Sequence, residues 1–352
     1  MRNASIHKFT ALAALTGAVV VASVHLLSAQ TASPVLLAAL RVNKKMGALA
    51  FIDPASGKIL ARVPTGDDPH GVTATPDGKT AYVANTSGIG GDSISVIDLA
   101  ARKEVDRVQT GPGSRPHDIL VAGGKVYFTA RGYKAVGRYD PANKTIAWFG
   151  IGQQGPHMLT LSPDGKTLYA ANPDSHSVAV IEDFAAPGWK LSLITVGGEG
   201  EGLDASPDGK EVWTADGEEN GGVSIINLAT KQVQSVPLQT VHTNRLEISP
   251  DGQYVFVLDR SEDAELIIVD AASRKIVKRM RPGVAGSEKV DFDVRDVAFA
   301  PDSSRAFVTT RTGASRYIAV IDLKTLNMTS QIDLPIGADE MVWVRGTIAG
   351  TR

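Results

Sequence analysis

The tripeptide Pro-Asp-Gly recurs along this 352-residue chain, and this repeat limits the possible folds more than any other feature. Four copies and one degenerate Pro-Asp-Ser copy begin at Pro76, Pro163, Pro207, Pro250 and Pro301. Proline favours the first corner of a tight turn and glycine tolerates a positive φ, so each copy predicts a turn between two strands. Strand–turn–strand units that repeat every ~40–45 residues are typical of propellers. The predicted fold is therefore all-β, a β-propeller.

The strand pattern predicts seven four-stranded antiparallel blades. The third blade shows it most clearly, because residues 156–162, 167–171, 177–181 and 189–196 are β-rich runs separated by turn residues. Six or eight blades are the alternatives. The seven predicted inner strands begin near Gly71, Asp118, Met158, Gly202, Arg245, Asp296 and Met341.

The last predicted inner strand, residues 341–344, has almost no chain after it. Its partners are predicted to be three N-terminal runs, residues 36–42, 48–53 and 59–63. Pairing of these N-terminal strands with the C-terminal inner strand would close the ring and cover strand edges that otherwise favour aggregation. We therefore expect residues 30–352 to form one propeller domain.

Residues 1–29 are predicted to be a signal peptide. Arg2 and Lys8 precede an uncharged, mostly apolar stretch over residues 11–24, and the small residues Ser28 and Ala29 follow it. This stretch is short for a membrane span. The alternative is an uncleaved membrane anchor. With the signal peptide cleaved, we expect a periplasmic or secreted monomer without a membrane span.

The composition excludes several kinds of chemistry. The chain has no cysteine, which rules out disulfides, thiolate metal sites, c-type haem and a cysteine-derived quinone cofactor. An exported chain without disulfides fits a bacterial periplasm. The formal net charge is −2, so no basic excess indicates a nucleic-acid partner.

The predicted site lies at one mouth of the central channel, where each inner strand of a propeller begins. Loops on a rigid scaffold often carry binding groups, and the loops after the second strands open on this face, opposite the repeated Pro-Asp-Gly turns. In five blades the predicted residue stands six positions before the turn proline. In blades 2 and 7, which lack this proline, alignment with the other blades selects the corresponding residue. With two residues from the loops, the predicted ligand-binding set is His70, His117, His157, Glu201, Asn244, Arg295, Glu340, Arg131 and Arg311.

The histidines allow more than one interpretation. His70, His117 and His157 could bind a divalent metal together with Glu201, because neutral imidazole and carboxylate are ligands for Zn, Cu or Fe. They could instead contact a ligand directly, or belong to the repeat itself with each ring bonded to neighbouring backbone. The arginines could hold an anionic group by bidentate contacts. The predicted partner is therefore a small anionic or zwitterionic molecule, or another protein.

Residues 69–85 read Pro-His-Gly-Val-Thr-Ala-Thr-Pro-Asp-Gly-Lys-Thr-Ala-Tyr-Val-Ala-Asn and resemble the YVTN-type propeller repeat. Residues 160–172 resemble it nearly as closely, and the resemblance extends over essentially the whole mature chain. It implies a seven-bladed fold of the YVTN and quinoprotein amine dehydrogenase-like kind. Blades 2 and 6 depart from the repeat at their turns, residues 122–124 and 301–304. The family includes binding proteins, lactonase-like enzymes and relatives of dehydrogenase subunits, so the fold does not settle the function.

Two hypotheses about function follow, and whether the protein is an enzyme stays open between them. The sequence contains no nucleophile elbow, HExxH helix or Rossmann glycine pattern. The first hypothesis is a periplasmic binding or interaction module with a polar, ligand- or metal-binding funnel at the channel mouth. The second is a lactonase-like hydrolase or lyase that acts on a small lactone or carboxylate, with a mouth histidine as general base.

Overall fold

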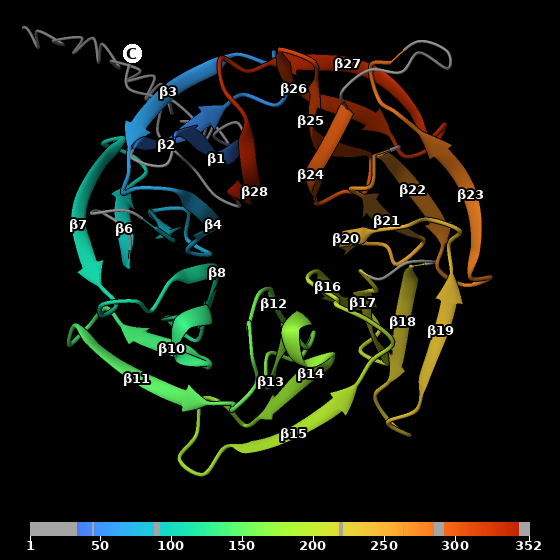
Figure 1. The fold of residues 1–352 in the computed structure, drawn as a ribbon. Helices are drawn as coiled ribbons and strands as arrows, with labels where there is room; N and C mark the ends of the chain where they lie inside the picture. Colours follow the sequence, from blue (N-terminus) through green and yellow to red (C-terminus); the bar gives the residue numbers. More distant parts are fainter. Residues whose placement is uncertain are drawn as a thin grey trace, which may run out of the picture. The chain divides into compact units, whose positions relative to one another are not determined.

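The computed structural model describes residues 34–43, 46–87, 92–217, 221–262, 264–284 and 292–344. All of them belong to one compact unit, Ala32–Arg352. The described strands form seven four-stranded antiparallel sheets around a common centre (Figure 1), which confirms the predicted seven-bladed propeller. The predicted signal peptide, residues 1–29, lies outside the described residues. No helix in the described part of the chain has the length and apolar character needed to cross a bilayer.

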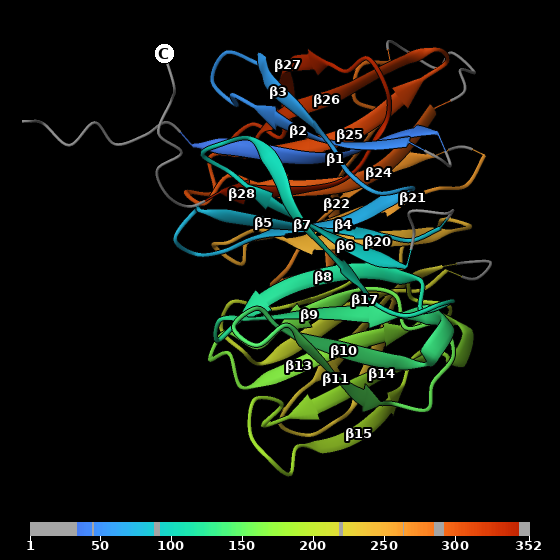
Figure 2. The same cartoon turned by 90° about the vertical axis from the view of Figure 1, so that its left-hand side faces the viewer.

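Each blade begins with an inner strand at the centre and ends with an outer strand at the rim. Blade 1 comprises β4 (Pro69–Ala74), β5 (Thr80–Asn85), β6 (Ser93–Asp98) and β7 (Lys103–Gln109). Blade 2 comprises β8 (Pro116–Ala122), β9 (Lys125–Ala130), β10 (Ala135–Asp140) and β11 (Thr145–Gly150). Blade 3 comprises β12 (Leu159–Leu161), β13 (Thr167–Asn172), β14 (Ser177–Glu182) and β15 (Lys190–Thr195). Figure 2 shows the four strands of blade 2 in this order.

The remaining blades repeat this arrangement. Blade 4 comprises β16 (Leu203–Ala205), β17 (Glu211–Ala215), β18 (Gly222–Asn227) and β19 (Val233–Pro237). Blade 5 comprises β20 (Thr243–Ile248), β21 (Tyr254–Asp259), β22 (Glu265–Asp270) and β23 (Lys275–Met280). Blade 6 comprises β24 (Phe292–Phe299), β25 (Arg305–Thr312), β26 (Ser315–Asp322) and β27 (Asn327–Asp333). Two short 3-10 turns, η1 (Arg131–Tyr133) and η2 (Pro173–Ser175), follow the second strands of blades 2 and 3.

Blade 7 joins the two ends of the propeller. Its strands are β28 (Ala338–Val344), β1 (Val35–Asn43), β2 (Met46–Ile52) and β3 (Ile59–Pro64), in that order from the centre. β28 pairs antiparallel with β1, which places Leu36 opposite Trp343 and Leu37 opposite Val342. The predicted closure is therefore confirmed, and the N-terminal strands fall close to their predicted positions.

The Pro-Asp-Gly segments form the tight turns that the sequence predicts. Gly165 has a φ of +68°, and its N–H donates to the Ser162 carbonyl at 2.8 Å. The Asp164 carboxylate accepts a hydrogen bond from the N–H of Lys166 at 3.1 Å, which fixes the exit of the turn. In blade 6, Ser303 takes the glycine position with a φ of +54°. The departure from the repeat therefore changes the residue and leaves the turn in place.

We predict that Gly165→Val lowers the free energy of unfolding by about 1–2 kcal/mol, because a side chain at positive φ is strained even where it has space. Gly209, at φ +70°, should respond in the same way. The matched control is Gly150→Val on the outer strand β11, since Gly150 has equally open surroundings but no positive φ. Urea denaturation measures the difference, and equal stabilities of the two variants would contradict the turn assignment.

Candidate functional site

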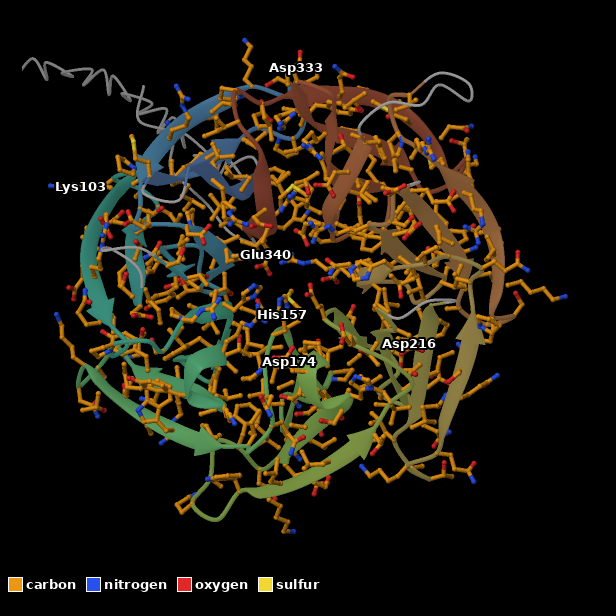
Figure 3. The ribbon with its side chains drawn as sticks, in the orientation of Figure 1. Lys103, His157, Asp174, Asp216, Asp333 and Glu340 are labelled. Atoms are coloured by element: carbon orange, nitrogen blue, oxygen red, sulfur yellow. The ribbon has the colours of Figure 1, made fainter. Side chains whose placement is uncertain are left out.

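Each blade places one polar side chain at the same level of one channel mouth. In six blades the polar residue is the second residue of the inner strand or lies just before the strand, whereas in blade 6 Arg295 is the fourth residue of β24. We call this set the mouth ring: His70, His117, His157, Glu201, Asn244, Arg295 and Asp339. Figure 3 shows His157 at the inner edge of the propeller, whereas Lys103 and Asp333 lie at its rim.

Three histidines form a continuous stack along one arc of the mouth ring. The ring centroids of His70 and His117 lie 3.9 Å apart, and those of His117 and His157 lie 3.8 Å apart. Strand pairing fixes this arrangement, because the N–H of His157 donates to the Ala171 carbonyl at 2.9 Å although β12 begins two residues later. We call these three residues the histidine arc.

The stack continues into a polar chain on blades 4 and 5. His157 Nε2 lies 3.6 Å from Glu201 Oε2, and the same oxygen accepts a hydrogen bond from Asn244 Nδ2 at 2.5 Å. Asn244 Oδ1 in turn accepts a hydrogen bond from Arg260 at 3.3 Å. Contacts between neighbouring blades thus link an imidazole, a carboxylate and an amide without a gap.

Ion pairs close the ring on blades 6 and 7. Arg295 Nε donates to Asp293 at 3.0 Å, and its terminal nitrogen lies 3.9 Å from Asp339. Asp339 accepts a hydrogen bond from Arg41 at 2.8 Å and lies 3.4 Å from His70 Nε2. The mouth is therefore divided into an arc of imidazoles and an arc of arginine–carboxylate pairs.

Burial keeps the histidine arc uncharged at neutral pH. His117 and His157 are only 3% and 4% exposed. Burial lowers the pKa of both imidazoles well below the ordinary value, and the nearby Arg245 adds to the effect. Burial also lowers the pKa of His70 to about 4, although Asp339 opposes the shift. All three side chains are therefore neutral at pH 7.

The histidine arc leaves hydrogen-bonding capacity unused. The Nδ1 atoms of His70, His117 and His157 are buried and have no hydrogen-bond partner among the described residues. In this part of the chain no hydrogen bond joins the rings of His117 or His157 to backbone, so the interpretation of these two rings as backbone-bonded elements of the repeat is not supported.

A buried arginine lies one residue deeper in the channel. Arg245 is 5% exposed and donates to Asp296 at 3.1 Å. Burial raises the pKa of Asp296 to about 7, while Arg245 acts in the opposite direction. Asp118 and Glu340 are hydrogen-bonded to each other, and burial raises the pKa of both carboxyl groups. These groups line a channel cavity of about 340 Å³ that continues away from the histidine arc.

The structure brings eight of the nine predicted residues together at the mouth. The ninth, Glu340, lies deeper in the channel. Arg131 lies in η1, where its charge helps to lower the pKa of His157, and Arg311 Nε on β25 lies 4.0 Å from Asp293. Glu340 does not stand at the level of the mouth ring, where Asp339 takes its place. No turn proline follows β28, so the count had to borrow the register of another blade.

Three residues at the mouth were missed by the sequence analysis: Arg41, Asp293 and Asp339. Arg41 comes from β1 at the opposite end of the chain, and only the closure of blade 7 brings it to the mouth. A count forward from the closing strand would have found Asp339. No local sequence signal marks Asp293.

The described residues include no group of three or more His, Asp or Glu side chains that could hold a metal ion. The neighbouring histidine rings lie with their centroids 3.9 and 3.8 Å apart and are tilted by 36° and 44°, whereas a shared metal requires the ring nitrogens to converge on one point about 2.0–2.1 Å from each. We therefore assign no metal to the mouth ring.

We predict that acidification destabilises the wild type through His70. Its pKa of about 4 in the folded protein lies below the unfolded value, so the unfolded state binds more protons as the pH falls from 6.5 towards 4. Between pH 7.5 and 4.5 the stability of the wild type should fall by about 2–3 kcal/mol relative to His70→Asn. Urea denaturation at both pH values measures this; a constant difference between the two proteins would contradict a neutral His70.

Comparison with known proteins supports the fold and not a particular activity. No protein-family model and no curated protein matches the sequence, so the YVTN resemblance rests on the repeat residues alone. The structure is similar to the periplasmic gluconolactonase of Pseudomonas aeruginosa, with a TM-score of 0.67 and 19% identity over 88% of this chain and 99% of that one. It is similar to apo AztD of Citrobacter koseri, with a TM-score of 0.63 and 15% identity over 88% and 98%. Hydrazine synthase of Kuenenia stuttgartiensis gives a TM-score of 0.60 and 20% identity over 82% and 90%.

Proposed function

We propose that this protein is a periplasmic binding module that holds a small, oxygen-rich organic molecule at the mouth ring. The observation that carries the proposal is the histidine arc, in which three neutral imidazoles have buried Nδ1 atoms without partners. An unpaired buried polar atom destabilises a free protein by about 1–3 kcal/mol. Packing of the blades does not require three such atoms side by side, whereas a ligand or ordered water could pair with them.

The chemistry of the ring indicates the kind of ligand. A neutral imidazole offers one donor and one acceptor, which matches a hydroxyl or carbonyl group. Glu201 and Asn244 extend this set of donors and acceptors along the mouth. A molecule with several oxygen atoms suits this surface better than an apolar one. The periplasmic location is part of the proposal and is supported by the signal-like N-terminus and by the similarity to a gluconolactonase described as periplasmic.

We predict that the double variant His157→Ala, Glu201→Gln loses binding of gluconate by roughly tenfold or more, because it removes the imidazole and the charge of the carboxylate that it contacts. Calorimetric titration measures the affinity. Circular dichroism should show an unchanged fold, since neither side chain belongs to the hydrophobic clusters that hold blades 2, 3 and 4 together. The control is Glu182→Gln, an exposed carboxylate at the end of β14. An equal loss of gluconate affinity in the double variant and in Glu182→Gln would place the binding site elsewhere.

A second candidate function, hydrolysis of a small lactone, is favoured by the His157–Glu201 contact of 3.6 Å. A carboxylate beside an imidazole can orient it as a general base. His157 would take a proton from water while the water oxygen bonds to the lactone carbonyl carbon. The ring C–O bond would then break, and the His157 imidazolium would return the proton to the leaving alkoxide to give the hydroxy acid. The fold similarity to a gluconolactonase makes gluconolactone the first substrate to test.

For this candidate we predict that His157→Ala lowers kcat for gluconolactone by roughly 10²–10⁴-fold, as expected for loss of a general base. The wild-type rate should be nearly constant between pH 6 and 8, because the pKa of His157 lies well below its ordinary value owing to burial. A pH-stat assay gives both results. Equal rates in wild type and His157→Ala would remove His157 from the reaction and leave binding as the function.

A further inference from the structure

A second pocket adjoins the mouth ring where blades 6 and 7 meet. Its volume is about 290 Å³, close to the lower end for small-molecule sites. Guanidinium groups from β1, β24, β25 and β26 line it, and no carboxylate lies among its lining residues. We call it the arginine pocket; its lining consists of Arg41, Arg295, Thr309, Thr310, Arg311, Arg316, Gly337 and Ala338.

The arginines are held in place and remain accessible. The side chains of Arg41, Arg295 and Arg311 are 31%, 35% and 34% exposed. Arg41 pairs with Asp68 and Asp339, yet a guanidinium carries five N–H donors and these pairs use only part of them. The ion pairs thus fix the orientation of Arg41 and leave further donors of this guanidinium for a ligand.

Arg316 is oriented by a different means. Its terminal nitrogen donates to the backbone carbonyls of Gly313 at 2.8 Å and Ser315 at 3.0 Å. The side chain is therefore fixed by the hairpin between β25 and β26 that carries it. A guanidinium held in this way loses little conformational freedom when it binds an anion.

A buried hydroxyl group also points to a ligand. Thr309 is 2% exposed, lines the pocket, and its Oγ1 has no hydrogen-bond partner among the described residues. The neighbouring Thr310 already donates its hydroxyl to the Tyr317 carbonyl at 3.1 Å. The unpaired hydroxyl beside four guanidinium groups is a donor that an oxyanion would satisfy.

The arginine pocket and the histidine arc share a border. Arg41 lines the pocket, and its terminal nitrogen lies 3.5 Å from His70 Nε2. Arg295 belongs both to the mouth ring and to the pocket lining. One small molecule can therefore contact imidazoles with one end and arginines with the other.

We propose that the arginine pocket binds the oxyanion group of the ligand, so that the ligand class is a hydroxylated small acid, with its carboxylate or phosphate group in the pocket and its hydroxyl groups on the histidine arc. This inference rests on the proposed function and adds the anionic end of the ligand to it. Planar, bidentate donors suit carboxylate and phosphate alike.

The test compares four probes by calorimetric titration of the full-length protein: gluconate, glycerol 3-phosphate, sorbitol and inorganic phosphate. Gluconate and glycerol 3-phosphate carry both an anion and hydroxyl groups, and the tighter of the two identifies the oxyanion. Arg316→Gln should weaken binding of that probe about 10- to 100-fold, the loss expected for a charge-assisted contact. The same variant should leave the affinity for sorbitol unchanged, because sorbitol carries no anionic group. The control Arg62→Gln removes the same charge from the exposed outer strand β3 and should change neither the affinity for the anionic probe nor the affinity for sorbitol.

A second variant, Thr309→Val, tests the arginine pocket independently in case Arg316→Gln does not fold. Thr309→Val keeps the side-chain shape and removes an unpaired buried hydroxyl, so binding of the anionic probe should weaken while thermal stability is kept or raised. Unchanged affinity in both Arg316→Gln and Thr309→Val would overturn the inference, as would failure of both anionic hydroxylated probes to bind the wild type. If the His157→Ala, Glu201→Gln variant alone loses binding, the arginine pocket is excluded and the proposed function stands.

Discussion

The antiparallel pairing of β28 with β1 is the interaction on which the rest of the structure depends. Leu36 and Leu37 of β1 are fully buried and belong to two different hydrophobic clusters, one packed against blade 6 and the other against blade 1. The N-terminal strand therefore joins the two ends of the ring through hydrogen bonds and through apolar contacts on both faces. Once the ring is closed, all seven inner strands must begin around one opening, and their first polar side chains must meet.

This convergence explains the electrostatics of the channel. Side chains that would be solvated on an open sheet are placed within contact distance and withdrawn from water, so burial decides their protonation. The imidazoles lose their charge at neutral pH, whereas the carboxylate of Asp339 keeps a pKa well below its usual range: burial opposes ionisation, but His70 (once it is protonated at low pH), Arg245 and Arg41 outweigh it. Deeper in the channel, Arg245 offsets part of the cost of burying Asp296. The mouth is thus neutral on one arc and charged on the other.

The fold and most of the mouth could be predicted from the sequence, because each Pro-Asp-Gly turn fixes the register of the inner strand before it. Counting from the turns placed His157, Glu201 and Asn244 correctly at one level. Blade 7 has no such turn, because its inner strand pairs with a strand from the far end of the chain, and the positions of Asp339 and Arg41 could not be predicted from a turn. The stacking of the histidines and the arginine pocket depend on distances between blades, which a one-dimensional pattern does not contain.

The effect of burial at the channel mouth can be measured from the protonation state of the histidine arc. In a protein labelled with ¹⁵N-histidine, the ring nitrogens distinguish neutral imidazole from imidazolium, and single His→Gln variants at positions 70, 117 and 157 assign the signals. If burial governs the channel mouth, all three rings titrate below their unperturbed pKa, because burial lowers the pKa of His70 to about 4 and those of His117 and His157 well below the ordinary value. Titration of these three rings near the unperturbed value of about 6.5 would contradict this effect of burial.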